Sequence, residues 1–312
     1  MLMNNTMNFK RIDGDSIFEK LSFTSSILIF FALTGITLSL IDGGWKAFSE
    51  FGPGFVFNNV WDPINSNFGA ASAIYGTLVT SFIAICIAVP VALGTAIFLA
   101  ELAPKWISTP VSKAIELLAA IPSIIYGMWG LFVFAPWFSE GFQMWALTNL
   151  SGLPIIGTWF SGPPIGIGLL SAGVILSFMI LPIMTALTRD ALRSIPDVLR
   201  EAAYGVGATP FEVITKVLLP KVKSAVASAG ILGLGRALGE TMAVAFVIGG
   251  ANRIETSLFM PASSISSTIA QQFNEATNEV HISSLIALGL VLFAITFIVM
   301  GAARYLVNRG KS

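Results

Sequence analysis

The 312-residue sequence has few charged residues, and this scarcity indicates its class. Asp, Glu, Lys and Arg make up 11% of the chain, against about 25% in soluble domains, and apolar residues make up 55%. The mean hydropathy is +0.82. We therefore expect an all-α integral membrane protein with one polytopic domain in the lipid bilayer. The formal net charge of zero gives no indication of a nucleic-acid partner.

Cysteine and histidine are nearly absent, since Cys86 and His281 are the only ones. One cysteine excludes an intramolecular disulfide, and one histidine excludes a histidine cluster for a metal. A Walker A loop is also missing, because the GKS at 310–312 has Tyr305 where the motif needs glycine. The GLGRALG at 233–239 is one residue longer than a dinucleotide-binding fingerprint and lies in an apolar run. We expect no catalytic site, metal or bound cofactor, and we expect the chain not to be an enzyme.

Six apolar segments are long enough to cross a bilayer, which takes about 20 residues. They are predicted at 22–41, 73–100, 117–138, 165–187, 225–248 and 283–303. Prolines interrupt three of them, at Pro90, Pro122 and Pro182. Two interpretations of these prolines are open, because they predict either simple kinks or a cavity between the helices.

Basic residues are distributed unevenly between the two sides of these six segments. Fourteen of the 17 lysines and arginines fall in the tails and loops of one side, whereas the other side has only Lys46 and Arg253. The positive-inside rule makes the basic side cytoplasmic. Both termini are thus predicted to be cytoplasmic, with tails at 1–21 and 307–312 around a transmembrane domain at 22–306.

The fifth segment differs from the others because it contains charges. Its stretch GLGRALGETMAV, residues 233–244, holds Arg236 and Glu240. On a continuous helix these side chains would share a face and reach each other, and each charge alone would cost about 2.5–3.5 kcal/mol at the helix centre. One interpretation is a substrate pathway, in which the guanidinium binds an oxyanion and the carboxylate tempers that contact or closes the path. The other is a structural ion pair.

Three glycines surround this arginine, namely Gly233, Gly235 and Gly239. The G-x-x-x-G spacing of the last two lets helix backbones approach closely. It predicts tight packing of the fifth span, either against a helix of a second subunit or within the same chain.

The connection at 188–224 is long, but its residues predict structure. IPDVLREAAYGVG predicts a short helix that starts near Pro196 and ends before Gly207. Thr209 and Glu212 predict a capping box at the start of a second helix. On these local signals the loop is either a docking device for another protein or an amphipathic hairpin on the membrane face.

The segment EAAYGVGATPFEVITKVLLP, residues 201–220, resembles the EAA loop of binding-protein-dependent ABC importer permeases. The residues that match its pattern are Glu201, Ala202, Ala203, Gly207, Val217, Leu219 and Pro220. In that family the loop forms a coupling helix that sits in a cleft of the ATPase subunit. The segments YGTLVTSF (75–82), ELLAAIPSIIYGMWGLFVFAP (116–136) and GLGRALGETMAV are similar to those of the phosphate-specific permeases of this family.

The resemblance implies a type I ABC importer permease fold with six transmembrane helices in the bacterial inner membrane, and import of inorganic phosphate. It implies a heterodimer with a second permease subunit (PstA-like) and a periplasmic phosphate-binding protein (PstS-like). It also implies an ATPase dimer (PstB-like) that carries the ATP and Mg. The alternatives are a permease for sulfate, molybdate or phosphonate, a secondary transporter or channel, and a scaffold or signalling protein without transport.

Overall fold

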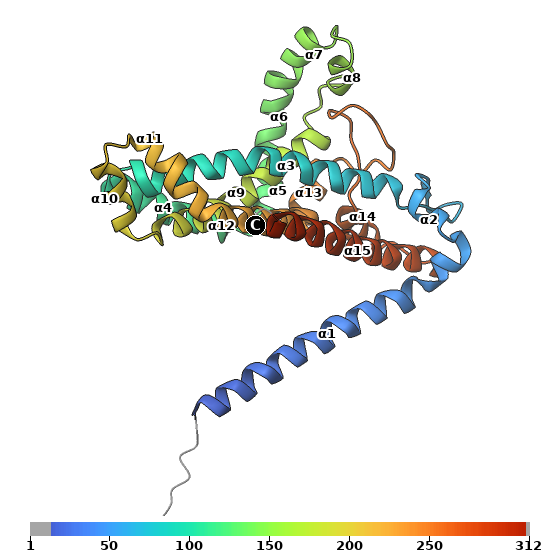
Figure 1. The fold of residues 1–312 in the computed structure, drawn as a ribbon. Coiled ribbons are helices and arrows are strands. Elements are labelled where there is room, and N and C mark those ends of the chain that lie inside the picture. Colours follow the sequence, from blue (N-terminus) through green and yellow to red (C-terminus); the bar gives the residue numbers. More distant parts are fainter. Residues whose placement is uncertain (1–13, 310–312) are drawn as a thin grey trace, which may run out of the picture.

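The computed structural model describes residues 14–309, which are mostly helical (Figure 1). The long helices are α1 (Gly14–Phe51), α3 (Ala71–Ile97), α9 (Leu169–Arg193), α12 (Leu219–Leu238) and α15 (Glu279–Arg309). The shorter helices are α2 (Gly54–Phe57), α4 (Lys105–Ala119), α5 (Ser123–Trp129), α6 (Ala135–Phe138), α7 (Met144–Leu150), α8 (Ile156–Trp159), α10 (Asp197–Gly205), α11 (Pro210–Glu212), α13 (Met242–Val247) and α14 (Ile265–Gln272). The π-helical segments are η1 (Phe98–Leu102), η2 (Gly130–Phe134), η3 (Ser139–Gln143) and η4 (Val213–Leu218), and one hairpin joins β1 (Trp61–Asp62) to β2 (Asn67–Phe68).

Helices of membrane-spanning length dominate the described part of the chain. Five of them are long and apolar enough to cross a bilayer, and a sixth crossing results if α4 and the helix Ser123–Leu150 count as one broken span. The expected all-α membrane fold is therefore confirmed. The orientation of the termini and the domain limits at 22–306 stay predictions.

The centre of the molecule is the pair α3 and α9, which pack along each other. Gly76, Thr80 and four alanines, Ala84, Ala88, Ala92 and Ala96, recur every fourth residue on α3 and are all buried. This stripe of small side chains lets the backbone of α9 approach closely, as in other membrane helix pairs. Larger side chains of α9 fill the remaining space, among them Ile175, Leu176 and Ile180, which are fully buried.

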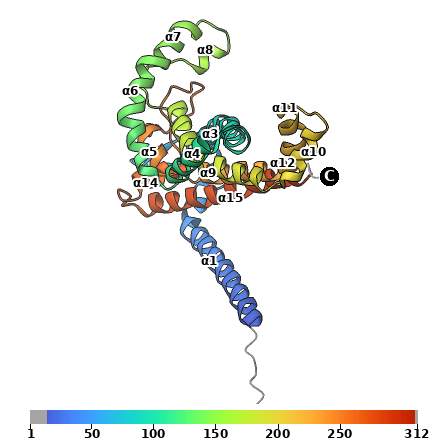
Figure 2. The same cartoon turned by 90° about the vertical axis from the view of Figure 1, so that its left-hand side faces the viewer.

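The third predicted span, 117–138, is not one straight helix. α4 ends at Ala119, and the chain bends by 95° before α5 begins at Ser123. Pro122 occupies the N-cap position of α5, and a proline there lacks the N–H that would continue α4. The helix then runs on to Leu150, well past the predicted end, and α6 to α8 project from the body of the molecule (Figures 1 and 2).

The first helix leaves the body of the molecule, as both ribbon views show (Figures 1 and 2). Only its C-terminal part packs against α15, where Gly43 and Gly44 approach Ile286 and Ala287. The Ser283 hydroxyl donates a hydrogen bond of 2.8 Å to the Gly43 carbonyl at this crossing. α1 begins at Gly14, inside the segment predicted as a tail. The residues of its N-terminal two thirds whose burial is described are almost all exposed in the single chain.

Gly76 provides a test of the close packing around α3. A Cβ at this position would overlap the carbonyl oxygen of Ser263, which belongs to the segment before α14. We expect Gly76→Ala to destabilise the protein by about 1–3 kcal/mol, because backbone atoms cannot move aside as a side chain does. The measurement is the Tm of the purified protein in detergent.

Gly94 is the matched control, because it lies in the same helix and a Cβ there would meet nothing within 4 Å. Gly94→Ala should leave the Tm unchanged or raise it slightly, since alanine is the better helix former. Equal Tm values for the two variants would show that the contact between α3 and Ser263 is not tight.

Candidate functional site

The charged stretch of the fifth span lies where that span is broken. α12 ends at Leu238, Gly239 is its C-cap, and α13 begins at Met242. The Glu240 carboxylate accepts a hydrogen bond of 3.2 Å from the backbone N–H of Ala243, in the first turn of α13. The glutamate thus satisfies a backbone donor that the break leaves without a helical partner.

Arg236 and Glu240 do not share a helix face, contrary to the geometry expected from their spacing. Arg236 is in the last turn of α12, and no ion pair or hydrogen bond links it to another residue of the range 14–309. Its positive charge suits the negative pole of α12, and the charge of Glu240 suits the positive pole of α13. The physical reason for the difference is the break, because the (i, i+4) distance holds only on a continuous helix.

The two broken spans meet beside this arginine. Gly127 of α5 leaves so little room that a Cβ would lie 3.0 Å from the Ala243 Cα and 3.0 Å from the Met242 carbonyl oxygen. Tyr126, the neighbour of Gly127, lies within electrostatic range of Arg236. The start of α5 and the α12–α13 junction therefore form one region. Non-helical backbone at membrane depth is tolerated only inside protein or beside a cavity.

Part of this region is uncovered in the single chain. Leu232, Arg236, Gly239 and Met242 are exposed and follow one side of the broken span, whereas Gly233, Ala237 and Ala243 are buried. The arrangement leaves the guanidinium at the surface of the second half of α12, which is otherwise apolar.

The three glycines around Arg236 have different neighbours. A Cβ on Gly233 would lie 2.7 Å from the Met184 Sδ of α9, and a Cβ on Gly235 would lie 2.9 Å from the Met300 Sδ of α15. These two glycines therefore pack within the chain. Gly239 is exposed and has no such neighbour, so it alone keeps a free side for a second subunit.

The loop between α9 and α12 begins both of its predicted helices, and the second of them, α11, continues through η4 into α12. α10 ends at Gly205, and Gly207 turns the chain with a φ of +86°, which favours glycine. The capping box is confirmed: the Glu212 N–H donates to the Thr209 hydroxyl over 3.4 Å, and the Thr209 N–H donates to the Glu212 carboxylate over 3.1 Å. The loop core, as we call the buried cluster here, combines the loop residues Ile195, Val213 and Leu218 with Ala96 of α3, Leu192 of α9 and Val222 of α12.

The residues of the EAA pattern divide into two groups. Ala203, Val217 and Leu219 are half-buried and pack against the loop core, whereas Glu201, Ala202, Gly207 and Pro220 are exposed. Within residues 14–309, Glu201 forms no ion pair. Large apolar side chains are exposed at the same tip, namely Val198, Tyr204, Val206 and Phe211. A folded loop that exposes this much apolar surface is typical of a site that binds another protein or a membrane surface.

Sequence reasoning missed the arginines that hold this loop. Arg200 bonds to Glu101 of η1, Arg193 to Ser108 of α4, and Arg189 to Glu116 of α4. The available signal was that the first three basic residues after the fourth span are all arginine, while lysines follow only at 216, 221 and 223. Their partners lie far away in sequence, so the pairing itself had no local signal.

In membrane transporters, the path of a polar substrate is formed where broken helices meet around a charged side chain. The molecule is therefore in the class of helical membrane permeases. The family described as "binding-protein-dependent transport system inner membrane component" matches residues 92–311. The chain belongs to this family and is a permease of an ABC importer.

Close relatives share most of the chain. It is 49% identical over 295 residues to a protein of Mesorhizobium japonicum, with 95% of this chain and 90% of the relative covered. It is 50% identical over 284 residues to a protein of Pasteurella multocida, with 91% and 88% covered. Both relatives are named phosphate transport system permease protein PstC.

Solved structures support the fold. The chain resembles a subunit of a bacterial alginate ABC transporter with a TM-score of 0.62 and 18% identity, over 96% of this chain and 98% of that one. It also resembles a chain of the MetNI methionine ABC transporter in an inward-facing conformation, with a TM-score of 0.53 and 21% identity, over 76% and 94%. The expected type I ABC importer permease fold is confirmed.

Proposed function

We propose that this permease passes inorganic phosphate from the periplasm to the cytoplasm across the bacterial inner membrane, with Arg236 on the path. The substrate is inferred from the relatives, which are named phosphate permeases and are about half identical over nine-tenths of the chain. The observation that carries the pathway is an arginine without a hydrogen-bonding or ionic partner within residues 14–309, exposed beside two broken spans.

The chemistry of the site fits an oxyanion. A guanidinium is always charged and offers parallel N–H donors that match two phosphate oxygens. Because Glu240 is held at the start of α13 by Ala243, it stays close to the path without neutralising Arg236. Its negative charge would repel phosphate just past the arginine, so that the anion is bound but released. Glu240 is in this way proposed to temper the contact or close the empty path.

The proposed partners each have a place on this chain. A second permease subunit (PstA-like) would form a heterodimer by covering the side with Leu232, Arg236 and Met242. An ATPase dimer (PstB-like), which carries the ATP and Mg, would bind the exposed tip of the EAA loop in the cytoplasm, where both termini would also lie. A periplasmic phosphate-binding protein (PstS-like) would deliver the substrate. The chain itself is proposed to bind no cofactor.

Reconstitution tests this function directly. The complex of both permeases and the ATPase, placed in liposomes with the binding protein outside and ATP inside, should accumulate radiolabelled phosphate. We expect excess unlabelled phosphate to abolish the signal and sulfate or molybdate to leave it intact. Equal competition by sulfate or molybdate would make the chain a permease for another oxyanion. Full uptake without the ATPase would make it a secondary transporter or channel, and ATPase binding without any flux would make it a scaffold.

A further inference from the structure

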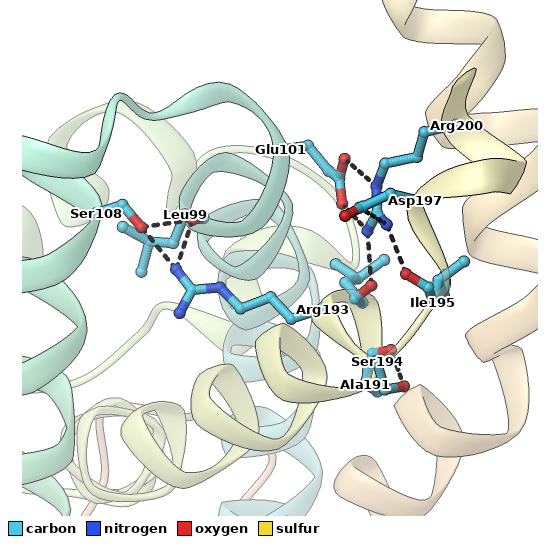
Figure 3. Close-up of polar contacts among 10 residues, drawn as sticks. Leu99, Glu101, Ser108, Ala191, Arg193, Ser194, Ile195, Asp197 and Arg200 are labelled. Atoms are coloured by element: carbon cyan, nitrogen blue, oxygen red, sulfur yellow. Dashed lines mark hydrogen bonds and ion pairs between the residues drawn. The ribbon is translucent and has the colours of Figure 1, made fainter.

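Arg200 holds the corner between α9 and α10 with every donor that it has. A guanidinium carries five N–H groups, and five hydrogen bonds are formed. Its Nε donates to Glu101 Oε2 over 3.1 Å. Its Nη2 donates to Glu101 Oε1 and to the Leu192 carbonyl, each over 2.8 Å. Its Nη1 donates to the Ile195 carbonyl over 2.7 Å and to Asp197 Oδ1 over 3.1 Å. Figure 3 shows Arg200 facing Glu101 and Asp197.

The pair of Arg200 and Glu101 is the most enclosed ion pair of the described residues, with side-chain exposures of 16% and 11%. The two bonds to the carboxylate form the bidentate geometry that fixes orientation as well as distance. Hydrogen bonding to Glu101 is also the main reason that the pKa of Arg200 is raised above its ordinary value. An enclosed, fully bonded pair of this kind is costly to break, because each partner would be left as a buried charge.

The pair joins the neighbouring segments α9 and α10 to a third segment that lies 99 positions away in the sequence. Arg200 belongs to α10, the two carbonyls belong to the end of α9 and the linker after it, and Glu101 belongs to η1, which continues α3. α10 therefore cannot swing away from α9 without pulling on the end of α3. A second arginine strengthens the same junction: Arg193 donates to the Ser108 hydroxyl over 2.7 Å and to the Leu99 carbonyl over 3.2 Å (Figure 3).

The opposite end of α3 contacts the segment that follows the α12–α13 break. The Ile265 N–H donates to the Thr77 hydroxyl of α3 over 2.9 Å, and Gly76 lies against Ser263. This segment returns to α13 through the Ala262 N–H, which donates to the Ile248 carbonyl over 2.9 Å. α3 thus connects the EAA loop at one end to the C-terminal end of α13 at the other, and the opposite end of this six-residue helix is held by Glu240.

We infer that the Arg200–Glu101 pair is the joint through which movement of α10 is passed to α3 and from there to the α12–α13 break. The inference rests on the proposed function, in which the ATPase moves the EAA loop. Arg200 and Glu101 are positioning residues here, because neither reaches the phosphate path. If this pair were weakened, the ATPase would still hydrolyse ATP, but the phosphate path would no longer open and close with the movement of α10.

The test compares phosphate uptake with ATP hydrolysis in the reconstituted transporter. The variants are Arg200→Lys, which keeps the charge but has no planar fork, Glu101→Gln, which keeps the shape, and the double variant. We expect the ATPase to co-purify with all three, and the phosphate moved per ATP hydrolysed to fall roughly tenfold in each single variant. The double variant should be no worse than the single ones, because the two side chains act as one unit.

Lys46→Gln is the control, because it breaks the 2.5 Å pair with Glu279 outside the EAA loop, where the Lys46 side chain is 49% exposed. It should leave the phosphate-to-ATP ratio unchanged. The inference is overturned if uptake and hydrolysis stay normal or fall in step, or if the variants fail to bind the ATPase, since the pair would then serve folding alone. A wild-type complex without ATP-driven phosphate uptake would instead remove the proposed function, and the inference with it.

Discussion

Replacement of Arg236 by glutamine should lower phosphate uptake by the assembled transporter by roughly 10- to 100-fold. This factor corresponds to the loss of charge-assisted hydrogen bonds to phosphate oxygens, which contribute about 1.5–3 kcal/mol to binding. No hydrogen bond or ion pair of residues 14–309 occupies the guanidinium of Arg236, so its removal breaks no internal contact of that kind. The measurement is the initial rate of labelled phosphate uptake into proteoliposomes, normalised to the amount of intact complex.

Two further variants separate charge from geometry. Arg236→Lys keeps a cation but loses the planar fork, so we expect an uptake rate between those of wild type and Arg236→Gln. Arg304→Gln removes an exposed arginine from α15 and should transport normally. Near-normal uptake in both Arg236→Gln and Glu240→Gln would contradict the pathway. The two charges would then only stabilise the helix ends on either side of the break.

Signals confined to a few neighbouring residues predicted much of this molecule. The apolar segments, the capping box of Thr209 and Glu212, and the turn at Gly207 each depend on residues within one or two helical turns. Their geometry is set by backbone preference and by local hydrogen bonds. The structure therefore contains them where they were expected, although helix ends differ by several residues.

The breaks were harder to predict, because apolar residues continue on both sides of each of them. The hydropathy of residues 225–248 indicates one continuous span, whereas α12 ends at Leu238. Gly239 and Glu240 were signals for the end of one helix and the start of another. The spacing of Arg236 and Glu240 was instead interpreted on a continuous helix, where an ion pair was one of two interpretations, and residues 14–309 contain no such pair.

Contacts between residues far apart in the sequence could not be predicted. Glu101 and Arg200 are separated by 99 positions, and nothing near either residue indicates the other. The count of basic residues included Arg200 only as part of a total, and it did not use Glu101. Their contact depends on how α3 packs along α9, which is a property of the assembled fold.

The second large effect is expected at the tip of the EAA loop, from Ala202→Trp. Ala202 is exposed on α10, whereas its neighbour Ala203 packs against the loop core, so an indole at 202 can point away from the fold. We expect the ATPase no longer to co-purify, and uptake to fall to the level of vesicles that lack the ATPase. The reason is steric, since a close-packed interface cannot accept a side chain of that size at a position built for a methyl group.

Ile64→Trp is the control for surface bulk, because Ile64 is 93% exposed in the turn between β1 and β2 and should tolerate the same side chain. The outcome also separates the two interpretations of this loop that local signals left open. Tryptophan is favourable at a membrane interface. If α10 rested on the membrane face as an amphipathic hairpin, Ala202→Trp would therefore anchor it more firmly and leave ATPase binding intact. If α10 is the docking surface, the same substitution separates the two proteins.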